Sequence, residues 1–249
     1  MGHTDTDGAT RNARIARIGL FGGTFDPVHK GHLAIARQAS EEARLDQVLF
    51  IPAADPPHKK TPGASYRHRV AMLETAFNRA PVDRALVDQE RFAISLLEAE
   101  LPFPSYTVDT LVELKKRLLY PRCYFIIGAD SLLDLHRWYQ YQRLLRLTHF
   151  IVLSRPGISL AAMQSAVQRL PGSFLPDTSS GQQKRWRSSN GAEILLLVNR
   201  LKKDISSTMI RAELRQGRVP ESMDSLESRV REYIAREGLY EAEYATLSR

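Results

Sequence analysis

Ile15-Ala-Arg-Ile-Gly-Leu-Phe-Gly-Gly-Thr-Phe-Asp-Pro-Val-His-Lys-Gly-His32 is the stretch that decides the fold. Its apolar start predicts a β-strand over residues 15–21, and the Gly22-Gly23 pair predicts a tight turn in which the backbone can take positive φ. From Leu33 the sequence Leu-Ala-Ile-Ala has helical composition, so we expect a helix over residues 31–44. The stretch therefore predicts a strand, a tight loop and the start of a helix.

Two histidines lie where this helix is expected to begin. Unpaired backbone N–H groups and the positive end of the helix dipole favour an anion at such a position. His29 and His32 share a face if the turn is already helical, and Gly31 leaves the approach to His32 unobstructed. A Gly-Gly pair or a lone histidine is commonly only structural, but the two together in this context indicate a phosphate site.

The composition is that of an ordinary globular protein with an excess of positive charge. The 249 residues, 43% apolar and 25% charged, can form one α/β domain with a sizeable core. The net charge of +7 and the pI of 9.6 predict anionic partners and leave nucleic acid, a membrane surface and phosphorylated small molecules open. Cys123, the only cysteine, excludes an internal disulfide, fits a reducing compartment and has apolar neighbours typical of a buried thiol.

The sequence lacks the marks of a membrane protein. No stretch approaches the roughly 18 consecutive apolar residues of a membrane-spanning helix, and the first eight residues are too polar for a signal peptide. We therefore expect a cytoplasmic protein without a membrane partner. It would consist of a flexible tail over residues 1–13 and a single domain over residues 14–249.

Short apolar runs alternate with longer helical patterns along the chain. Strands are predicted at 47–52, 85–87, 122–127, 149–153 and 194–198, and helices at 66–78, 107–119, 131–147, 160–170, 207–216 and 226–237. Ser105 or Thr107 is the expected N-cap of the third helix, and Gly238 the expected stop of the last. Such alternation gives parallel strands joined by right-handed crossovers. The predicted fold is α/β: a Rossmann-like, doubly wound, mainly parallel sheet with a small C-terminal helical part over about residues 205–240.

One segment does not fit the alternation. Residues 171–191 are polar and rich in chain-breaking residues, so we expect an excursion or mobile loop rather than a second domain. Its Lys184-Arg-Trp-Arg187 cluster is typical of a solvated basic loop and, less often, of a nucleic-acid contact.

Four further clusters contain side chains that can bind a ligand. Ile205-Ser-Ser-Thr-Met-Ile-Arg211 places hydroxyls and an arginine at a helix start, where they can cap the helix or surround phosphate oxygens. Gly128 and Asp130 follow a strand, and the carboxylate can bind ribose hydroxyls or cap a helix. His58 and Lys59 lie in a proline-stiffened loop. Thr107 and the Trp138-Tyr139 pair can belong to the core or form a wall for a heteroaromatic ring.

With these residues in place, the chain resembles a known family. Gly22-Gly-Thr-Phe-Asp-Pro-Val-His-Lys-Gly-His32 closely resembles the ATP-binding signature of the nucleotidyltransferases with a His-x-Gly-His motif, and the motifs up to Arg211 are similar to those of bacterial nicotinate mononucleotide adenylyltransferases. The segment 91–104 fits this pattern less well. The resemblance implies catalytic roles for His29, His32 and Arg211. It implies ATP contacts from Gly22, Gly23, Thr24, Phe25, Gly128, Asp130, Ser206, Ser207 and Thr208, and mononucleotide contacts from His58, Lys59, Thr107, Trp138 and Tyr139.

The implied reaction transfers AMP from ATP to nicotinate mononucleotide. It needs no protein nucleophile, because the attacking phosphate is already anionic near neutral pH, and the histidines then act as charge stabilisers. Mg²⁺ would be bound mainly by the ATP phosphates and water, with no protein ligand expected beyond an outside chance for Asp26.

Several alternatives stay open at this point. A sister adenylyltransferase would act on nicotinamide mononucleotide or phosphopantetheine. A basic nucleic-acid-binding protein is the alternative of a different class, although nucleic acid is the less favoured partner. A class I aminoacyl-tRNA synthetase is disfavoured, because no Lys-rich second signature is evident. A homo-oligomer is also open.

Overall fold

The computed structural model describes residues 16–55, 62–78, 91–104, 106–118, 121–177, 184–201, 205–216 and 224–241. The tail expected over residues 1–13 and the strand expected at 85–87 lie outside these ranges. So do His58 and Lys59.

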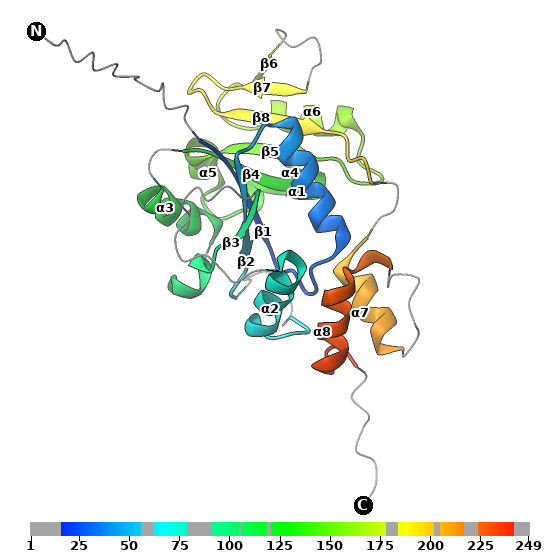
Figure 1. The fold of residues 1–249 in the computed structure, drawn as a ribbon. Helices are drawn as coiled ribbons and strands as arrows, with labels where there is room; N and C mark the ends of the chain where they lie inside the picture. Colours follow the sequence, from blue (N-terminus) through cyan, green and yellow to red (C-terminus); the bar gives the residue numbers. More distant parts are fainter. Residues whose placement is uncertain are drawn as a thin grey trace, which may run out of the picture.

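An eight-stranded sheet forms the centre of the molecule, with the strand order β3-β2-β1-β4-β5-β8-β7-β6 (Figure 1). All neighbours from β3 to β8 are parallel, whereas β7 and β6 are antiparallel. The strands are β1 (Arg17–Gly23), β2 (Gln47–Pro52), β3 (Phe92–Ile94), β4 (Arg122–Gly128), β5 (His149–Leu153), β6 (Leu175–Pro176), β7 (Arg185–Arg187) and β8 (Glu193–Leu197). From β1 the chain continues through β2 to β3 at one edge of the sheet, whereas from β4 it continues through β5 to β8 in the opposite direction. This reversal confirms the Rossmann-like, doubly wound fold.

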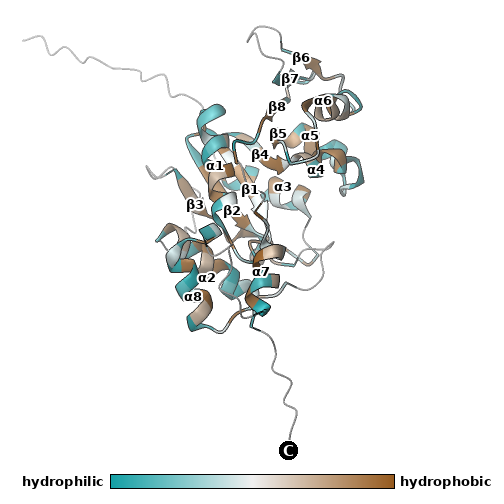
Figure 2. Cartoon of the chain, turned by 90° about the vertical axis from the view of Figure 1, so that its right-hand side faces the viewer, coloured by the Kyte–Doolittle hydropathy of each residue, from teal (hydrophilic) through white to brown (hydrophobic). Residues whose placement is uncertain are grey.

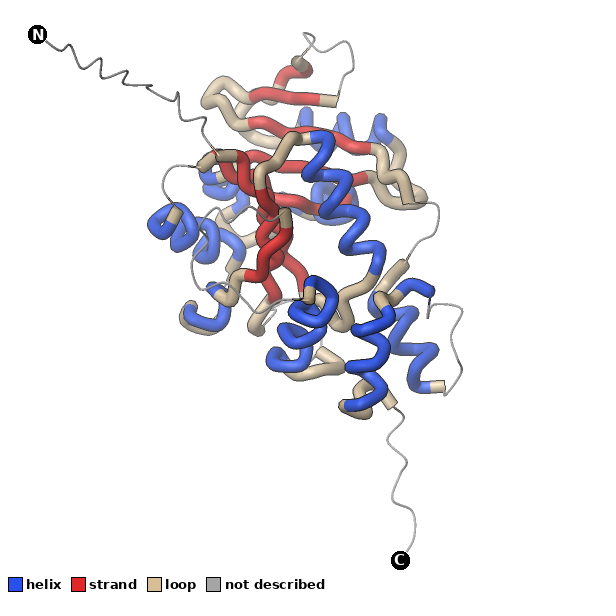
Figure 3. The backbone as a smooth tube through the Cα atoms, viewed as in Figure 1, coloured by secondary structure: helices blue, strands red, loops and turns tan. Residues whose placement is uncertain are grey.

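Helices cover both faces of this sheet (Figure 3). They are α1 (Lys30–Glu42), α2 (Tyr66–Phe77), α3 (Thr107–Arg117), α4 (Ala129–Leu133), α5 (Tyr141–Leu147), α6 (Leu160–Gln168), α7 (Ser207–Arg215) and α8 (Ser228–Arg236), with short 3₁₀ turns η1 (Leu97–Glu100) and η2 (Leu135–Arg137). Buried residues of α1, α2, α7 and α8 share one apolar core, and those of α3 to α6 share the other. Two cores on opposite faces are what a doubly wound sheet requires.

The sequence of the central strands explains their position. β2 and β8 are buried along their whole length, and Figure 2 shows apolar colour in the sheet and polar colour on the outer sides of several helices. Both faces of a parallel sheet are covered by helices, so its strands are apolar without alternation. The thiol of Cys123 is buried in β4, as its apolar neighbours predict, and burial raises its pKa to about 11.

The C-terminal helical part packs beside α2. Val230 and Ile234 of α8 are buried in the same core as α1 and α2, and Figure 1 shows α8 lying next to α2. The hydroxyl of Tyr233 forms a 2.9 Å hydrogen bond with Nδ1 of His68 across this contact. Gly238 has φ +59° just after α8, which confirms the predicted helix stop.

Residues 171–191, expected as an excursion or mobile loop rather than a second domain, contain two strands of the main sheet in their described part, so the prediction of a mobile loop is wrong there. Strands β6 and β7 extend the sheet beyond β8, and Trp186 is 3% exposed because its side chain packs into the apolar core. Arg185 and Arg187 form ion pairs with Glu193 on the adjacent strand, and Arg187 also pairs with Asp177. The basic cluster is therefore part of a strand with partly neutralised charge, not a solvated loop.

Smaller differences concern element ends. β1 ends two residues later than predicted, so Gly22 and Gly23 are its last residues, and neither has positive φ. In the loop that follows, Phe25 has a left-handed backbone conformation, with φ +50°. Segment 91–104 contains β3 and η1. Within the described ranges, no helix combines the length and apolar character needed to cross a membrane.

Candidate functional site

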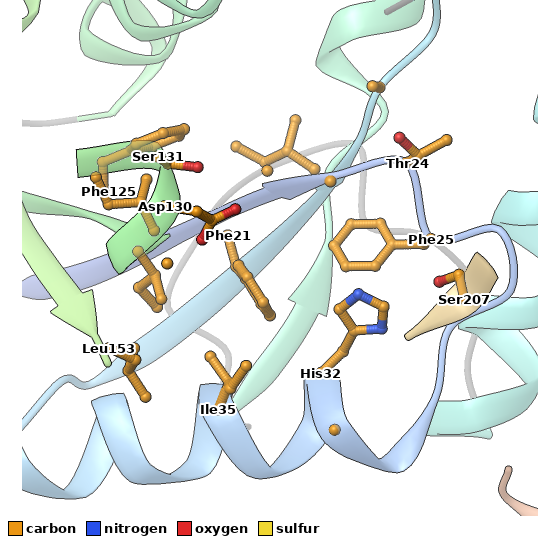
Figure 4. A pocket seen from close by; sticks show the side chains of 18 of the residues that line it. Phe21, Thr24, Phe25, His32, Ile35, Phe125, Asp130, Ser131, Leu153 and Ser207 are labelled. Carbon is orange, nitrogen blue, oxygen red and sulfur yellow. The ribbon is translucent and has the colours of Figure 1, made fainter. Parts of the chain in front are cut away.

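A cavity of about 1060 Å³ opens at the carboxyl edge of the parallel strands. It lies at the ends of β1 and β4, where the direction of winding changes, which is where open α/β sheets bind ligands. Every predicted site residue within the described ranges lines it: Gly22, Gly23, Thr24, Phe25, His29, His32, Thr107, Gly128, Asp130, Trp138, Tyr139, Ser206, Ser207, Thr208 and Arg211. The topology thus brings together residues that are almost 190 positions apart. Figure 4 shows His32 beside Phe25 and Ser207 at one end of this cavity, and Asp130 and Ser131 at the other.

The glycine pair allows close packing at the end of β1. A Cβ at Gly23 would lie 3.0 Å from the ring of Phe25, and one at Gly22 would lie 3.4 Å from the ring of Phe125. Phe25 is 1% exposed and packs edge-on to Phe21, with ring centroids 5.7 Å apart. The two glycines therefore serve close approach rather than the positive φ that we expected.

The two histidine rings stack at the N-terminus of α1. His29 is the N-cap, and the ring centroids of His29 and His32 are 3.7 Å apart with an angle of 27° between the planes. The backbone N–H of His29 donates to Nδ1 of His32 at 3.3 Å, which places the proton of a neutral His32 ring on Nε2. A Cβ at Gly31 would lie 2.9 Å from Nδ1 of His29, so Gly31 makes room for that ring.

His29 is electrostatically unusual. It is 5% exposed, and within the described part of the chain its Nδ1 has no hydrogen-bond partner. Burial, and secondarily the positive charge of Arg155, lower the pKa of His29 from 6.5 to about 4. At pH 7 the ring is therefore neutral, and a nearby polyanion would raise its pKa.

The start of α7 docks directly against the loop after β1. Ser206 is the N-cap, and its Oγ accepts the N–H of Met209 at 3.2 Å, so the capping interpretation holds for this serine. The Ser207 hydroxyl donates to the carbonyl of Pro27 at 3.0 Å. One turn later, Nη2 of Arg211 donates to Oγ1 of Thr208 at 3.4 Å. Two helix N-termini, those of α1 and α7, thus converge on one region of the cavity.

Asp26 lies buried beneath this region. Its carboxylate accepts the N–H groups of Gly63 at 2.7 Å and Ala64 at 3.0 Å, and the hydroxyl of Tyr240 at 2.7 Å. Nη1 of Arg211 donates to the Asp26 carbonyl at 2.6 Å and lies 3.5 Å from Oδ2. Asp26 was considered above as an improbable metal ligand; its contacts instead join four segments of the chain.

At the end of β4, Gly128 and Asp130 contact Arg155, which is not among the residues predicted from the sequence. Nε of Arg155, which follows β5, lies 2.9 Å from Oδ1 of Asp130. A Cβ at Gly128 would collide with the Asp130 carboxylate and with the Arg155 side chain. A charged residue directly after a buried parallel strand is the signal that could have identified Arg155, because such strand ends share one edge.

Aromatic side chains at the start of α3 and just after η2 also line the cavity. The Tyr106 and Tyr139 rings lie 4.4 Å apart at 33°, and Trp138 packs edge-on to Phe125 at 6.1 Å. The N-cap of α3 is Tyr106, so the prediction of Ser105 or Thr107 is wrong, and Thr107 is the first helical residue. Tyr139 is 49% exposed, which leaves an aromatic edge at the mouth of the cavity.

Two further charged residues were not predicted: Glu98, which is partly buried and lines the cavity, and Arg69, which is buried outside the cavity lining. Glu98 accepts hydrogen bonds from the Thr110 hydroxyl at 3.2 Å and from the N–H of Ala54 at 3.3 Å, and burial raises its pKa. Arg69, 1% exposed, donates to the carbonyls of Thr24 at 2.8 Å and Ala54 at 3.4 Å. No sequence pattern around these residues distinguishes them from surface charges. Among the described residues, no group of three or more His, Cys, Asp or Glu side chains could hold a metal ion.

Comparison with known proteins shows the family of the chain. Residues 20–213 match the Cytidylyltransferase-like family. The chain is 39% identical to a probable nicotinate-nucleotide adenylyltransferase of Carboxydothermus hydrogenoformans over 90% of this chain and 98% of the relative. It is 46% identical to one from Synechococcus over 62% of this chain and 72% of the relative.

A solved structure is similar in fold. The nicotinic acid mononucleotide adenylyltransferase of Plasmodium falciparum, complexed with NaAD, has a TM-score of 0.68 at 18% identity, covering 90% of this chain and 97% of that one. Fold, motif spacing and sequence similarity over nearly the whole length agree. The chain therefore belongs to the Cytidylyltransferase-like nucleotidyltransferases and, within them, to the nicotinate-nucleotide adenylyltransferases.

Proposed function

We propose that this protein transfers the AMP part of ATP to nicotinate mononucleotide and releases pyrophosphate. A phosphate oxygen of the mononucleotide attacks the α-phosphorus of ATP, and the bond from that phosphorus to the pyrophosphate oxygen breaks. The observation that carries the proposal is that one cavity is lined both by two helix N-termini, which favour phosphate, and by the aromatic side chains of Tyr106, Trp138 and Tyr139. The names of the relatives support the same substrates.

At the phosphate end, the donors converge without a nucleophile. His29 and His32 at the start of α1, and Ser206, Thr208 and Arg211 at the start of α7, would bind the phosphates of ATP. The hydroxyls of Ser206 and Thr208 act as acceptors within the protein, so their O–H groups can still donate to a ligand. Such preformed donors stabilise the charge that builds up on the transferring group and on pyrophosphate.

Ser207 would contribute differently from its neighbours. Its hydroxyl proton is already directed at the Pro27 carbonyl, so it holds α7 against the loop after β1. Gly128, Asp130 and Ser131 would face the adenosine half of ATP.

The N-terminus of α3 supports a preference for the acid over the amide. Tyr106 and Thr107 line the cavity at this terminus, whose backbone N–H groups and helix dipole favour a carboxylate. A hydrogen bond to a charged group contributes about 1.5–3 kcal/mol, against about 1 kcal/mol for a neutral one. The difference of about 0.5–2 kcal/mol favours nicotinate over nicotinamide by about 2- to 30-fold. Trp138 and Tyr139 would lie beside the ring.

Mg²⁺ fits this site as a partner of the ATP phosphates. The described residues offer no carboxylate cluster, and the carboxylate of Asp26 is occupied by N–H and O–H donors. Phosphate oxygens and water would supply most of the ligands of the ion, which neutralises charge on the polyphosphate.

Pyrophosphate release tests the proposal. Purified protein with ATP and Mg²⁺ is offered nicotinate mononucleotide, nicotinamide mononucleotide or phosphopantetheine in turn. We expect clear turnover with nicotinate mononucleotide; no release with any acceptor would overturn the enzymatic reading, and faster release with another acceptor would reassign the substrate.

Two variants connect the activity to the cavity. His32→Ala should lose turnover far more than it loses folding stability. His136→Ala is the matched control, because His136 lies in η2, outside the cavity residues, and its ring bonds only to the carbonyl of Leu133 among the contacts described.

A further inference from the structure

The last described turn of the chain reaches the phosphate end of the cavity. After α8, Gly238 turns the backbone, and Tyr240 folds back with φ +66°. Its ring is 7% exposed and lies in the apolar core shared by α1, α2 and α8. Its hydroxyl donates to Oδ1 of Asp26 at 2.7 Å across 214 residues of sequence. Burial and then the adjacent Asp26 carboxylate raise the pKa of Tyr240, so its hydroxyl stays protonated and remains a donor.

Asp26 relays this contact to the guanidinium of Arg211. Nη1 of Arg211 is held by the Asp26 carbonyl at 2.6 Å and faces Oδ2 at 3.5 Å. The side chain of Arg211 is 23% exposed and lines the cavity, so its other N–H groups can face a ligand. An arginine whose guanidinium is already held by protein contacts loses less side-chain entropy when it binds phosphate than an unrestrained one does.

The surrounding packing leaves little freedom to this relay. A Cβ at Gly63 would lie 3.0 Å from Cδ of Arg211 and 3.1 Å from Cε1 of Tyr240, so the loop at Gly63 presses against both side chains. The N–H of Gly63 donates to the same Asp26 carboxylate at 2.7 Å. Removing the Tyr240 hydroxyl alone would keep the ring against Gly63, so its effect on Arg211 would pass through Asp26 rather than through the Gly63 loop.

We propose that Tyr240 is a positioning residue for the phosphate site: its hydroxyl fixes the Asp26 carboxylate, and Asp26 holds Arg211 toward the phosphates of ATP. The inference rests on the proposed function for its effect on turnover. Its effect on ATP affinity does not depend on which acceptor is used.

The test compares two tyrosines of the same helical part. Tyr240→Phe removes only the hydroxyl that reaches Asp26. Tyr233→Phe removes a hydroxyl that bonds to His68, between α8 and α2, away from the cavity residues. Binding of a non-hydrolysable ATP analogue with Mg²⁺ is measured by calorimetry, and pyrophosphate release is measured with nicotinate mononucleotide. Tyr240→Phe should weaken analogue binding about tenfold and lower kcat/KM for ATP by a similar factor, with KM for the mononucleotide unchanged. Tyr233→Phe should stay within twofold of wild type in all three.

A double-mutant cycle separates positioning from a general structural role. In the Arg211→Ala background, Tyr240→Phe should have no further effect on analogue binding, because the relay ends at Arg211. Wild-type affinity in Tyr240→Phe, or the same tenfold loss in both backgrounds, would overturn the proposal. If wild-type protein binds the analogue but releases no pyrophosphate, the proposed function fails while the binding cycle still decides the role of Tyr240.

Discussion

Acidification should destabilise this protein through His29. The ring is buried and neutral at pH 7, with a pKa lowered to about 4 by burial and by the charge of Arg155. An unfolded chain would titrate at the ordinary value of 6.5. A histidine with a lowered native pKa binds its proton more readily when unfolded. Its contribution to stability is therefore present above pH 6.5 and is lost as the pH falls toward 4.

The size of the loss follows from these two pKa values. Between pH 7 and pH 5 the linkage relation gives a decrease in the free energy of unfolding of about 2 kcal/mol from His29 alone. Near pH 5.5 the slope is about 1.2 kcal/mol per pH unit, because unfolding takes up nearly one proton. An effect of this size is a large fraction of the typical stability of a domain.

Urea denaturation at several pH values measures this contribution. His29→Gln keeps a polar side chain but cannot titrate, so subtracting its pH profile from that of wild type removes the other groups. We expect wild type to lose about 2 kcal/mol more than the variant between pH 7 and pH 5. Identical profiles, or an NMR titration of His29 with a midpoint near 6.5, would refute the reasoning.

Other substitutions test neighbouring parts of the structure. Gly31→Ala should displace the His29 ring and lower kcat at least tenfold, while circular dichroism shows helix content unchanged, because alanine favours helices. Arg155→Ala should raise the pKa of His29 from about 4 toward 6.5 in an NMR titration; an unchanged value would remove Arg155 as a cause. Trp186→Ala should cost about 3–5 kcal/mol in urea denaturation, since the side chain is buried in the core, with KM values unaffected. A shift in KM there would show that the β6–β7 extension influences the cavity.

Local signals in the sequence were sufficient for the fold and for most of the cavity lining. The apolar runs at β2 and β8 have the form that parallel strands require, and a helix N-terminus follows each of the motifs at His29 and Ser206. Because parallel strands end at one edge, the meeting of distant motifs could be predicted without coordinates. Roles for individual side chains in this lining stay predictions.

The features that could not be predicted from the sequence depend on contacts between residues far apart in the chain. Trp186 lies among polar and basic residues, which locally favour a loop. The segment forms a strand because the Trp186 ring packs into the apolar core beside β8. Local preference favours a turn at the glycine pair. In the structure, however, Gly23 ends a strand and makes room for the ring of Phe25. Segments far away in sequence bury Asp26 and Arg69 and partly bury Glu98, and no local pattern predicts such burial.

The contact between Asp26 and Tyr240 also limits how early during protein synthesis this part of the cavity can be completed. The loop after β1 is among the first parts of the domain to leave the ribosome, yet its carboxylate meets Tyr240, 214 residues later. At a synthesis rate of about 5–20 residues per second, this interval is roughly 10–40 s. A nascent chain that has already formed β1, β2 and β4 therefore still lacks the Tyr240 contact of Asp26. Premature termination before Tyr240 would keep every described strand of the sheet in the chain but would deprive the Asp26 carboxylate of this hydroxyl donor.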